Sequence, residues 1–239
     1  MSLLDDFLSR YAREIDFYTE VARLCARQCE TRLEQMGIRA IVTFRAKRPD
    51  RLREKVNARA AEKNYQRVEE IYDDVVDLAG VRIALYFPGD IIEVENVLNS
   101  QFVVRHTKVF PRDSGKPQYE KRFSGYAARH YHVHLASKEL LQDQQRYASA
   151  HIEIQVASVL VHAWAEVEHD LVYKPLSGRL SEDEYAILDE LNGLVLAGEI
   201  ALERLQRAGK LRVAKQGQRF NNHYELASYI YDRLTKKDR

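Results

Sequence analysis

The chain has 239 residues, of which 45% are hydrophobic and 31% are charged, and this composition is typical of a globular protein. Its formal net charge is only +1, so no overall electrostatic field marks it as a nucleic-acid binder. No apolar run is long enough to cross a bilayer, and the first residues lack the basic-then-apolar order of a signal peptide. We therefore expect no membrane association and a cytoplasmic location.

The first part of the chain predicts three helices and two strands. Apolar side chains recur at helical spacing over residues 2–36, which predicts a long amphipathic helix. A β-branched run predicts a strand over 38–44. After Pro49, residues 50–75 predict a helix rich in Arg and Lys, and residues 81–87 predict the second strand, followed by a turn and a short helix.

The second part predicts three more strands and then helices. The strands cover 102–109, 130–136 and 151–156. From residue 158 onward the pattern is helical, and Ser181 with Glu184 forms a capping box for a helix that is expected to end near Ala208. Beyond Gly209, a last amphipathic helix is predicted over 222–236.

These elements predict an α+β fold in which a mixed five-stranded sheet is flanked by helices. We expect an N-terminal helix over 1–37, a core over 38–175 and a C-terminal helical extension over 176–239.

Two acidic residues lie at predicted buried strands. Asp77 precedes the strand at 81–87, and Glu153 lies within the strand at 151–156, where its apolar neighbours indicate a buried opposite face. A buried carboxylate needs a partner or a metal, and two that converge can hold a divalent cation against a polyphosphate. A cap between helix and strand is the alternative role for Asp77.

Basic residues are concentrated after the first strand. Arg45 and Lys47 share one side of that strand, and a basic helix over 51–67 follows. Such a cluster suits a triphosphate, because Arg and Lys neutralise its non-bridging oxygens. A solvated helix face is the alternative explanation.

Two histidine patterns are also open to more than one interpretation. A period of two places three histidines on one face of a strand, which suggests a three-histidine metal site or packing residues: His130, His132 and His134. A helical face carries a second set, which suggests a metal site or a polar cleft wall: His162, Glu166 and His169.

The polar loop over 111–125 has a length that usually carries function. It ends at Gly125, beside Tyr126, and a tyrosine held there could stack on a nucleobase. Turn chemistry explains the Gly-Tyr pair equally well.

In chain order, these segments resemble the synthetase domain of the RelA/SpoT-type alarmone synthetases, particularly the small single-domain forms. The matching blocks are 44–47 with Lys55, 77–83, 125–130, 153–156 and 162–174. The resemblance implies a nucleotidyltransferase-like core and the transfer of the β,γ-pyrophosphate of ATP to the 3′-hydroxyl of GDP or GTP, which makes guanosine tetra- or pentaphosphate. No covalent nucleophile is required for such a transfer.

The resemblance also implies a role for each residue. On the ATP side, Arg45 and Arg82 would sandwich the adenine, and Lys47 and Lys55 would hold the phosphates. At the reacting centre, Asp77 and Glu153 would carry Mg²⁺, Glu153 would help to deprotonate the 3′-hydroxyl, and Gln155 would orient it. On the acceptor side, the implied residues are Tyr126, His130, Glu168 and His162.

Two departures from the family pattern leave the acceptor open. Ala157 stands where the family commonly has arginine after the Glu-Ile-Gln-Val strand, and Ala127 follows the Gly-Tyr pair where arginine is usual. The alternatives are the same transfer onto adenine nucleotides or the tRNA 3′ end, or a catalytically silent nucleotide-binding module. The resemblance further implies a homo-oligomer, a dimer or a tetramer.

Overall fold

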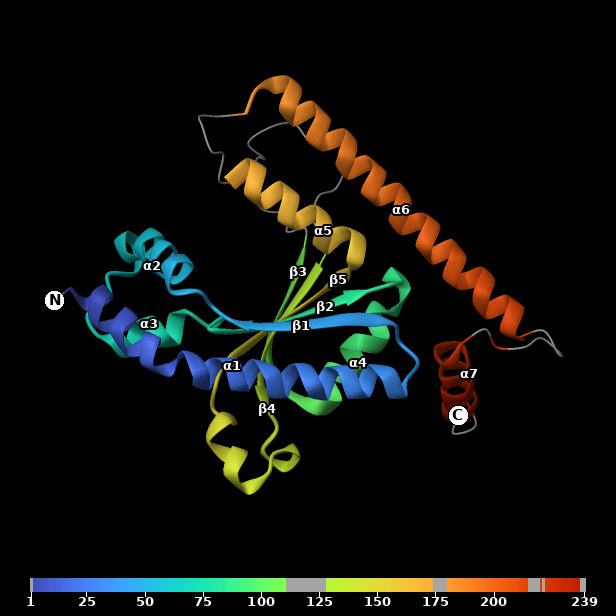
Figure 1. Cartoon of the computed structure of the whole chain (residues 1–239), viewed down its shortest axis with the longest axis horizontal. Coiled ribbons are helices and arrows are strands. Elements are labelled where there is room, and N and C mark those ends of the chain that lie inside the picture. The colour runs from blue at the N-terminus through green and yellow to red at the C-terminus, as the bar shows by residue number, and fades with distance from the viewer. Residues whose placement is uncertain (1, 111–127, 174–179, 215–219, 221, 237–239) are drawn as a thin grey trace.

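The structure is a computed structural model that describes residues 2–110, 128–173, 180–214, 220 and 222–236 (Figure 1). Its helices are α1 (Leu3–Gln35), α2 (Pro49–Lys63), α3 (Val68–Asp74), α4 (Ile91–Gln101), α5 (Val159–Glu168), α6 (Glu182–Ala214) and α7 (His223–Lys236). Its strands are β1 (Ala40–Ala46), β2 (Ala79–Leu85), β3 (Phe102–Phe110), β4 (Ala128–Leu135) and β5 (Ile152–Ser158).

The five strands form one sheet in the order β1-β2-β5-β4-β3. Strands β2 and β5 are parallel, and every other neighbouring pair is antiparallel. Helices α1 and α4 lie on one side of this sheet, and α5 and α6 lie on the other (Figure 1). The predicted α+β architecture with a mixed five-stranded sheet is therefore confirmed.

The two faces of the sheet differ in polarity because side chains alternate along each strand. In β2, Val81 and Ile83 are buried in the main core together with Ile154 of β5 and residues of α1 and α4. Arg82 and Glu153 lie between these apolar positions and point to the opposite face. We call this opposite face, with its arginine, carboxylate and histidines, the polar face of the sheet.

Helix α1 packs in two hydrophobic cores. Its C-terminal half packs on the sheet, where Val21, Leu24 and Leu33 are buried in the main core. Its N-terminal half packs against α2 and α3 in a second, smaller core that includes Phe7 and Tyr11. Strand β1 runs from the main core to the second core. Because α2 follows β1 and packs in the second core, it lies next to the end of the sheet at which β2 starts.

The region predicted as one helix over 50–75 is instead two helices, so that prediction was wrong. Helix α2 ends at Asn64, which adopts a left-handed conformation with φ 48°, and α3 starts after Arg67. Asn is one of the few residues that tolerate this conformation, and it commonly ends helices there. The side chains of Arg59 and Tyr65 then bind Asp74 across the break, with donor–acceptor distances of 2.7 Å each.

Helix α6 extends beyond its predicted end. The capping box is present, since Ser181 Oγ accepts from the Glu184 backbone N–H and the Glu184 carboxylate accepts from Ser181. Gly209 does not end the helix, which continues to Ala214. A glycine inside a helix costs only about 1 kcal/mol relative to alanine, and the flanking residues are good helix formers.

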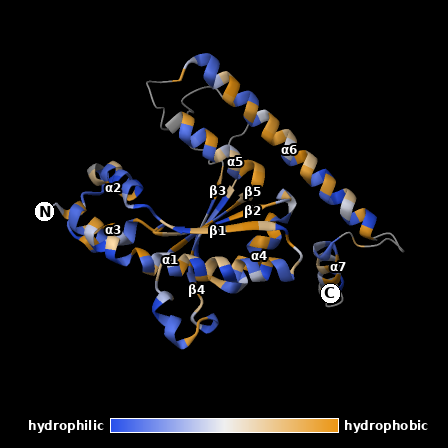
Figure 2. Cartoon of the chain, viewed as in Figure 1, coloured by the Kyte–Doolittle hydropathy of each residue, from blue (hydrophilic) through white to orange (hydrophobic). Residues whose placement is uncertain are grey.

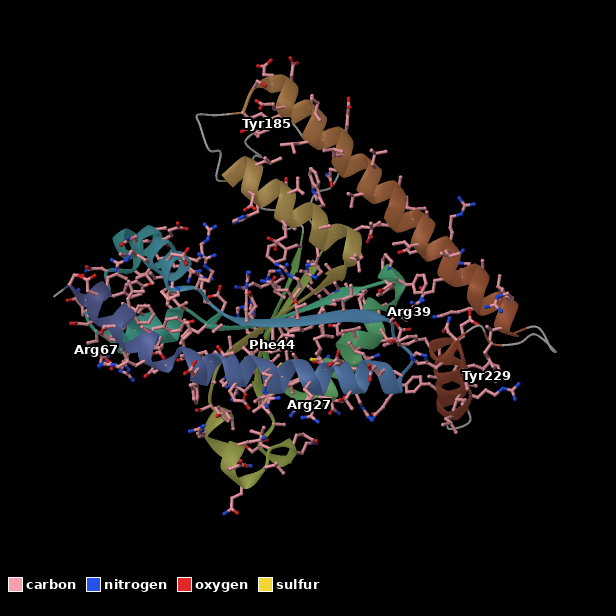
Figure 3. The ribbon with its side chains drawn as sticks, in the orientation of Figure 1. Arg27, Arg39, Phe44, Arg67, Tyr185 and Tyr229 are labelled. Atoms are coloured by element: carbon pink, nitrogen blue, oxygen red, sulfur yellow. The ribbon has the colours of Figure 1, made fainter. Side chains whose placement is uncertain are left out.

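Helix α7 packs on the turn between α1 and β1 (Figure 3). Gly37 makes this approach feasible, because a Cβ atom there would lie 2.5 Å from the backbone nitrogen of Ser228. The guanidinium of Arg39 lies 4.7 Å and 5.2 Å from the ring centroids of Tyr86 and Tyr224. Within the described chain, no helix is both long enough and apolar enough to cross a membrane.

Candidate active site

Strand register collects the candidate residues on the polar face. Strands β4 and β5 pair so that His132 lies opposite Glu153 and His130 lies opposite Gln155. Strand β2 places Arg82 opposite Gln155 on the other side of β5. Residues directly opposite each other in adjacent strands point to the same face, so these five side chains form one continuous polar surface.

Glu153 lies at the centre of this surface. Its Oε1 is 3.2 Å from His130 Nδ1 and 3.5 Å from His132 Nε2, and its Oε2 accepts a hydrogen bond of 2.8 Å from the Gln155 side-chain amide. Burial alone would raise the pKa of Glu153, but the two imidazoles and the amide outweigh it and hold that pKa well below its usual value. Glu153 is therefore an ionised carboxylate at neutral pH.

Asp77 lies at the start of β2 in a different environment. Its Oδ2 contacts the ammonium groups of Lys47 and Lys55 at 2.6 Å and 2.8 Å. Burial would raise the pKa of Asp77, but the two lysines outweigh it and keep that pKa below its usual value. Helix α3 ends at Asp74 with Val75 as its C-cap, so the geometry does not support the alternative in which Asp77 caps a helix.

The two carboxylates consequently differ in charge balance. Two ammonium groups over-compensate the charge of Asp77, whereas within the described part of the chain Glu153 contacts imidazole and amide groups. One acceptor of Asp77, Oδ1, is buried and has no hydrogen-bond partner within the described part of the chain. An unused carboxylate oxygen is a suitable ligand for Mg²⁺, which typically takes only one or two protein carboxylates and completes its shell with water and phosphate.

No set of three or more His, Cys, Asp and Glu side chains among the described residues is arranged to hold a metal ion by itself. The three-histidine pattern of β4 divides between two contacts: His130 and His132 contact Glu153, whereas the ring of His134 lies 4.5 Å from that of His151.

The two arginines expected at the adenine lie on neighbouring strands. Arg45 of β1 is exposed and lies opposite Gly80, two positions from Arg82 on β2. Arg82 forms an ion pair with Glu166 of α5. The geometry therefore places Arg45 and Arg82 on one face of the sheet, while α5 supplies an acidic partner to one of them.

Helix α5 begins at the end of β5, where Ser158 Oγ accepts a hydrogen bond from the Val161 backbone N–H. Its His162 is buried, and the imidazole Nε2 lies 3.2 Å from the Ile83 carbonyl oxygen, to which it donates. Burial lowers the pKa of His162 to about 4, so this imidazole is neutral at pH 7. Its role in the structure is to fix α5 to β2.

The other residues predicted on α5 differ in exposure and in their contacts. Glu168 is buried at the end of α5, but His169 is exposed and contacts Asp170. His162, Glu166 and His169 make three separate contacts, with Ile83, Arg82 and Asp170 respectively. Tyr126 lies outside the described residues, so its predicted role stays a prediction, and Lys174, the last residue of the matching block 162–174, also lies outside them.

The basic segment after β1 is neutralised by acidic neighbours. Its ion pairs are Arg48–Asp50, Arg51–Glu54, Arg53–Asp5, Lys55–Asp77, Arg59–Asp74, Lys63–Asp74 and Arg67–Glu70. Only Lys55 of this set contacts the candidate site. Arg67 lies at the connection from α2 to α3, towards the N-terminal end of α1 (Figure 3). Most of the segment is thus a solvated, charge-balanced surface.

Sequence reasoning missed two contacts of the site. His132 was predicted to be a metal ligand or a packing residue, and its contact with Glu153 was not predicted. Glu166 was predicted to belong to a metal site or a polar cleft wall, and its ion pair with Arg82 was not predicted. The period of two in β4 was the available signal for His132, whereas the Arg82–Glu166 pair joins residues 84 positions apart and left no local signal.

Comparison with known proteins identifies the region of the chain that contains these candidate residues. The family model described as "Region found in RelA / SpoT proteins" matches residues 44–177. The GTP pyrophosphokinase YwaC of Bacillus subtilis (strain 168) is 32% identical over 107 residues. That alignment covers 44% of this chain and 46% of YwaC, so the chain matches about half the length of this curated relative.

Solved structures of low sequence identity share the fold over most of their length. A GTP pyrophosphokinase family protein from Streptococcus pneumoniae superposes with a TM-score of 0.61 at 20% identity, covering 87% of this chain and 95% of that one. The small alarmone synthetase 1 from Bacillus subtilis, solved bound to its product pppGpp, gives a TM-score of 0.59 at 22% identity, covering 85% and 96%.

Proposed function

The chain belongs to the family defined by the region found in RelA and SpoT proteins, and on that premise we propose that it is a nucleotide pyrophosphokinase. In the proposed reaction the 3′-oxygen of GDP or GTP attacks the β-phosphorus of ATP. The bond between the β-phosphorus and the oxygen bridging it to the α-phosphorus breaks, AMP leaves, and the 3′-hydroxyl loses its proton. The products are guanosine tetra- or pentaphosphate and AMP.

The observation that supports this proposal most is the state of Glu153. It is an ionised carboxylate on the polar face, held by His130 and Gln155. Among the described residues no lysine or arginine is paired with Glu153, so this carboxylate can approach a hydroxyl proton or a cation. Its orientation by fixed donors fits a reaction that depends on positioning and electrostatics.

The remaining residues fit the parts of the same reaction. Lys47 and Lys55 are two ammonium groups fixed side by side by Asp77, and they can neutralise the triphosphate of ATP. Arg45 and Arg82, on one face of the sheet, are suited to stack on the adenine. His130, which lies opposite Gln155, is the described residue best placed to approach the acceptor.

A divalent cation is the remaining component of the proposed reaction. We propose Asp77 and Glu153 as the protein ligands of Mg²⁺, Asp77 through its Oδ1, which has no hydrogen-bond partner among the described residues. When bound, the cation would neutralise charge that develops on the phosphate oxygens. The same argument predicts that Asp77 has two functions: it fixes the lysines through one oxygen and offers the other to the cation.

A guanosine nucleotide is the acceptor that the relatives favour, because the small alarmone synthetase 1 is described with pppGpp as its product. Transfer onto adenine nucleotides is the first alternative. Transfer onto tRNA is less well supported, because the basic segment near the site is already paired with acidic side chains. We further propose a cytoplasmic location, where ATP and GTP are both present, and a homo-oligomer.

The test is a transfer assay with ATP labelled at the γ-phosphate and Mg²⁺. Separate reactions contain GDP, GTP, adenine nucleotides, deacylated tRNA or no acceptor, and each is repeated with Glu153→Gln. Label on a guanosine nucleotide that is lost in the variant supports the proposal. Label only on adenine nucleotides or tRNA overturns the acceptor, and no transfer to any acceptor indicates a catalytically silent nucleotide-binding module.

A further inference from the structure

His132 is a buried histidine on the polar face for which the proposed reaction gives no role. Its side chain is enclosed, and the residue is only 8% exposed. The ring nitrogen Nε2 is fully buried and makes no hydrogen bond within the part of the chain that the structure describes. A buried polar nitrogen without a partner is uncommon and requires an explanation.

The nearest acceptor is the carboxylate of Glu153. His132 Nε2 lies 3.5 Å from Glu153 Oε1, just beyond a normal hydrogen bond. The same oxygen lies 3.2 Å from His130 Nδ1. Oε1 of Glu153 therefore lies within 3.5 Å of a ring nitrogen of both histidines, and the two distances differ by only 0.3 Å.

The neighbouring strands set the position of His132 in the sheet. It is the direct cross-strand neighbour of Glu153 in the pairing of β4 with β5, which sets the separation of the two side chains. On its other side, the ring of His106 in β3 lies 5.6 Å away. The imidazole of His132 therefore lies between Glu153 of β5 and His106 of β3.

We propose that His132 is a positioning residue for Glu153, and this inference rests on the proposed pyrophosphate transfer. In the resting state Oε1 faces His130. When the acceptor engages His130, Glu153 turns and accepts a hydrogen bond from the N–H at His132 Nε2. Oε1 of the buried carboxylate therefore has a hydrogen-bond donor in both states, and the Gln155 amide continues to donate to Oε2.

Three variants test this inference by steady-state transfer kinetics. His132→Phe keeps an aromatic ring but removes the donor, and His132→Gln keeps an N–H that can reach the carboxylate. His134→Phe is the matched control, because His134 contacts His151 and not Glu153. We expect His132→Phe to lower kcat between about tenfold and a hundredfold with little change in the KM for ATP, since a hydrogen bond to a charged group is lost.

The outcomes separate positioning from packing. Recovery of most of the kcat in His132→Gln, with His134→Phe near the wild type, supports the inference. A kcat of His132→Phe within twofold of the wild type overturns it, and so does a His132→Gln variant as impaired as His132→Phe. Melting temperatures of the three variants show whether each is folded under the assay conditions.

A second measurement on the wild type does not depend on activity. Proton–nitrogen correlation spectra of histidine-labelled protein report which ring nitrogen of His132 carries the proton. We expect the Nε2 of His132 to carry a proton, and an imidazole protonated only at Nδ1 overturns the inference. If the wild type transfers no pyrophosphate, the proposed function fails, while this spectrum still decides whether His132 can donate to Glu153.

Discussion

Replacing Asp77 by asparagine tests the lysine cluster that the structure places beside the polar face. The carboxylate contacts two ammonium groups, at 2.6 Å and 2.8 Å, and its side chain is 14% exposed. Breaking a buried ion pair by removing one partner costs about 3–5 kcal/mol. Lys47 and Lys55 remain 21% and 25% exposed, so they can turn towards water, and solvent screening reduces the expected loss to about 2 kcal/mol.

Thermal unfolding followed by circular dichroism measures this loss. For a chain of this length, a loss of 1 kcal/mol lowers the melting temperature by about 2–4 °C, so Asp77→Asn should melt about 4–8 °C below the wild type. In a double-mutant cycle, Asp77→Asn with Lys47→Met should lose less than the two single losses together, because the variants share one interaction. An unchanged melting temperature, or strictly additive losses, would refute the ion cluster.

Three other predictions follow from single features. The pKa of Glu153 is held below its ordinary value of 4.5, so its contribution to stability is complete above that pH and is lost as the pH falls. Below about pH 5, the free energy of unfolding in urea should therefore depend less on pH for Glu153→Gln than for the wild type. An equal pH dependence of the two proteins would contradict the lowered pKa of Glu153. Gly37→Ala should lower the free energy of unfolding by about 1–2 kcal/mol, because Gly37 has φ +73° and a Cβ atom there would contact α7. Limited proteolysis should then cleave α7 faster in this variant than in the wild type, and equal cleavage rates would contradict the packing of α7 on Gly37. Leu194 and Leu205 of α6 are 69% and 61% exposed, and Figure 2 shows apolar bands along this helix. Replacing both leucines by glutamate should therefore dissociate the proposed homo-oligomer in light scattering, whereas a monomeric wild type would refute that proposal.

Local patterns were sufficient to predict the sheet and its two carboxylates. Alternation of polar and apolar residues identified the strand containing Glu153, because one buried face requires a period of two. The predicted strand over 81–87 was observed as Ala79–Leu85, a shift of two residues at the ends. Strand boundaries depend on where pairing with neighbours stops, which the local pattern does not contain.

The features that could not be predicted depend on distant residues or on a single backbone conformation. The break at Asn64 is one residue in a left-handed conformation within an otherwise helical charge pattern. The pairing of Lys55 with Asp77 and of Arg82 with Glu166 arises only after the sheet has formed. The contact of His132 with Glu153 likewise requires the register of β4 against β5, which is set by the whole sheet.

The measurement that tests the central claim most directly is the position of the transferred group in the product. Wild-type protein is incubated with Mg²⁺, ATP and GDP, and the purified product is analysed by phosphorus–proton correlation NMR. We expect a pyrophosphate on the 3′-oxygen of the guanosine nucleotide together with an equal amount of AMP, and neither product with Glu153→Gln. A single phosphate on the acceptor, release of ADP, or undiminished product with Glu153→Gln would contradict it.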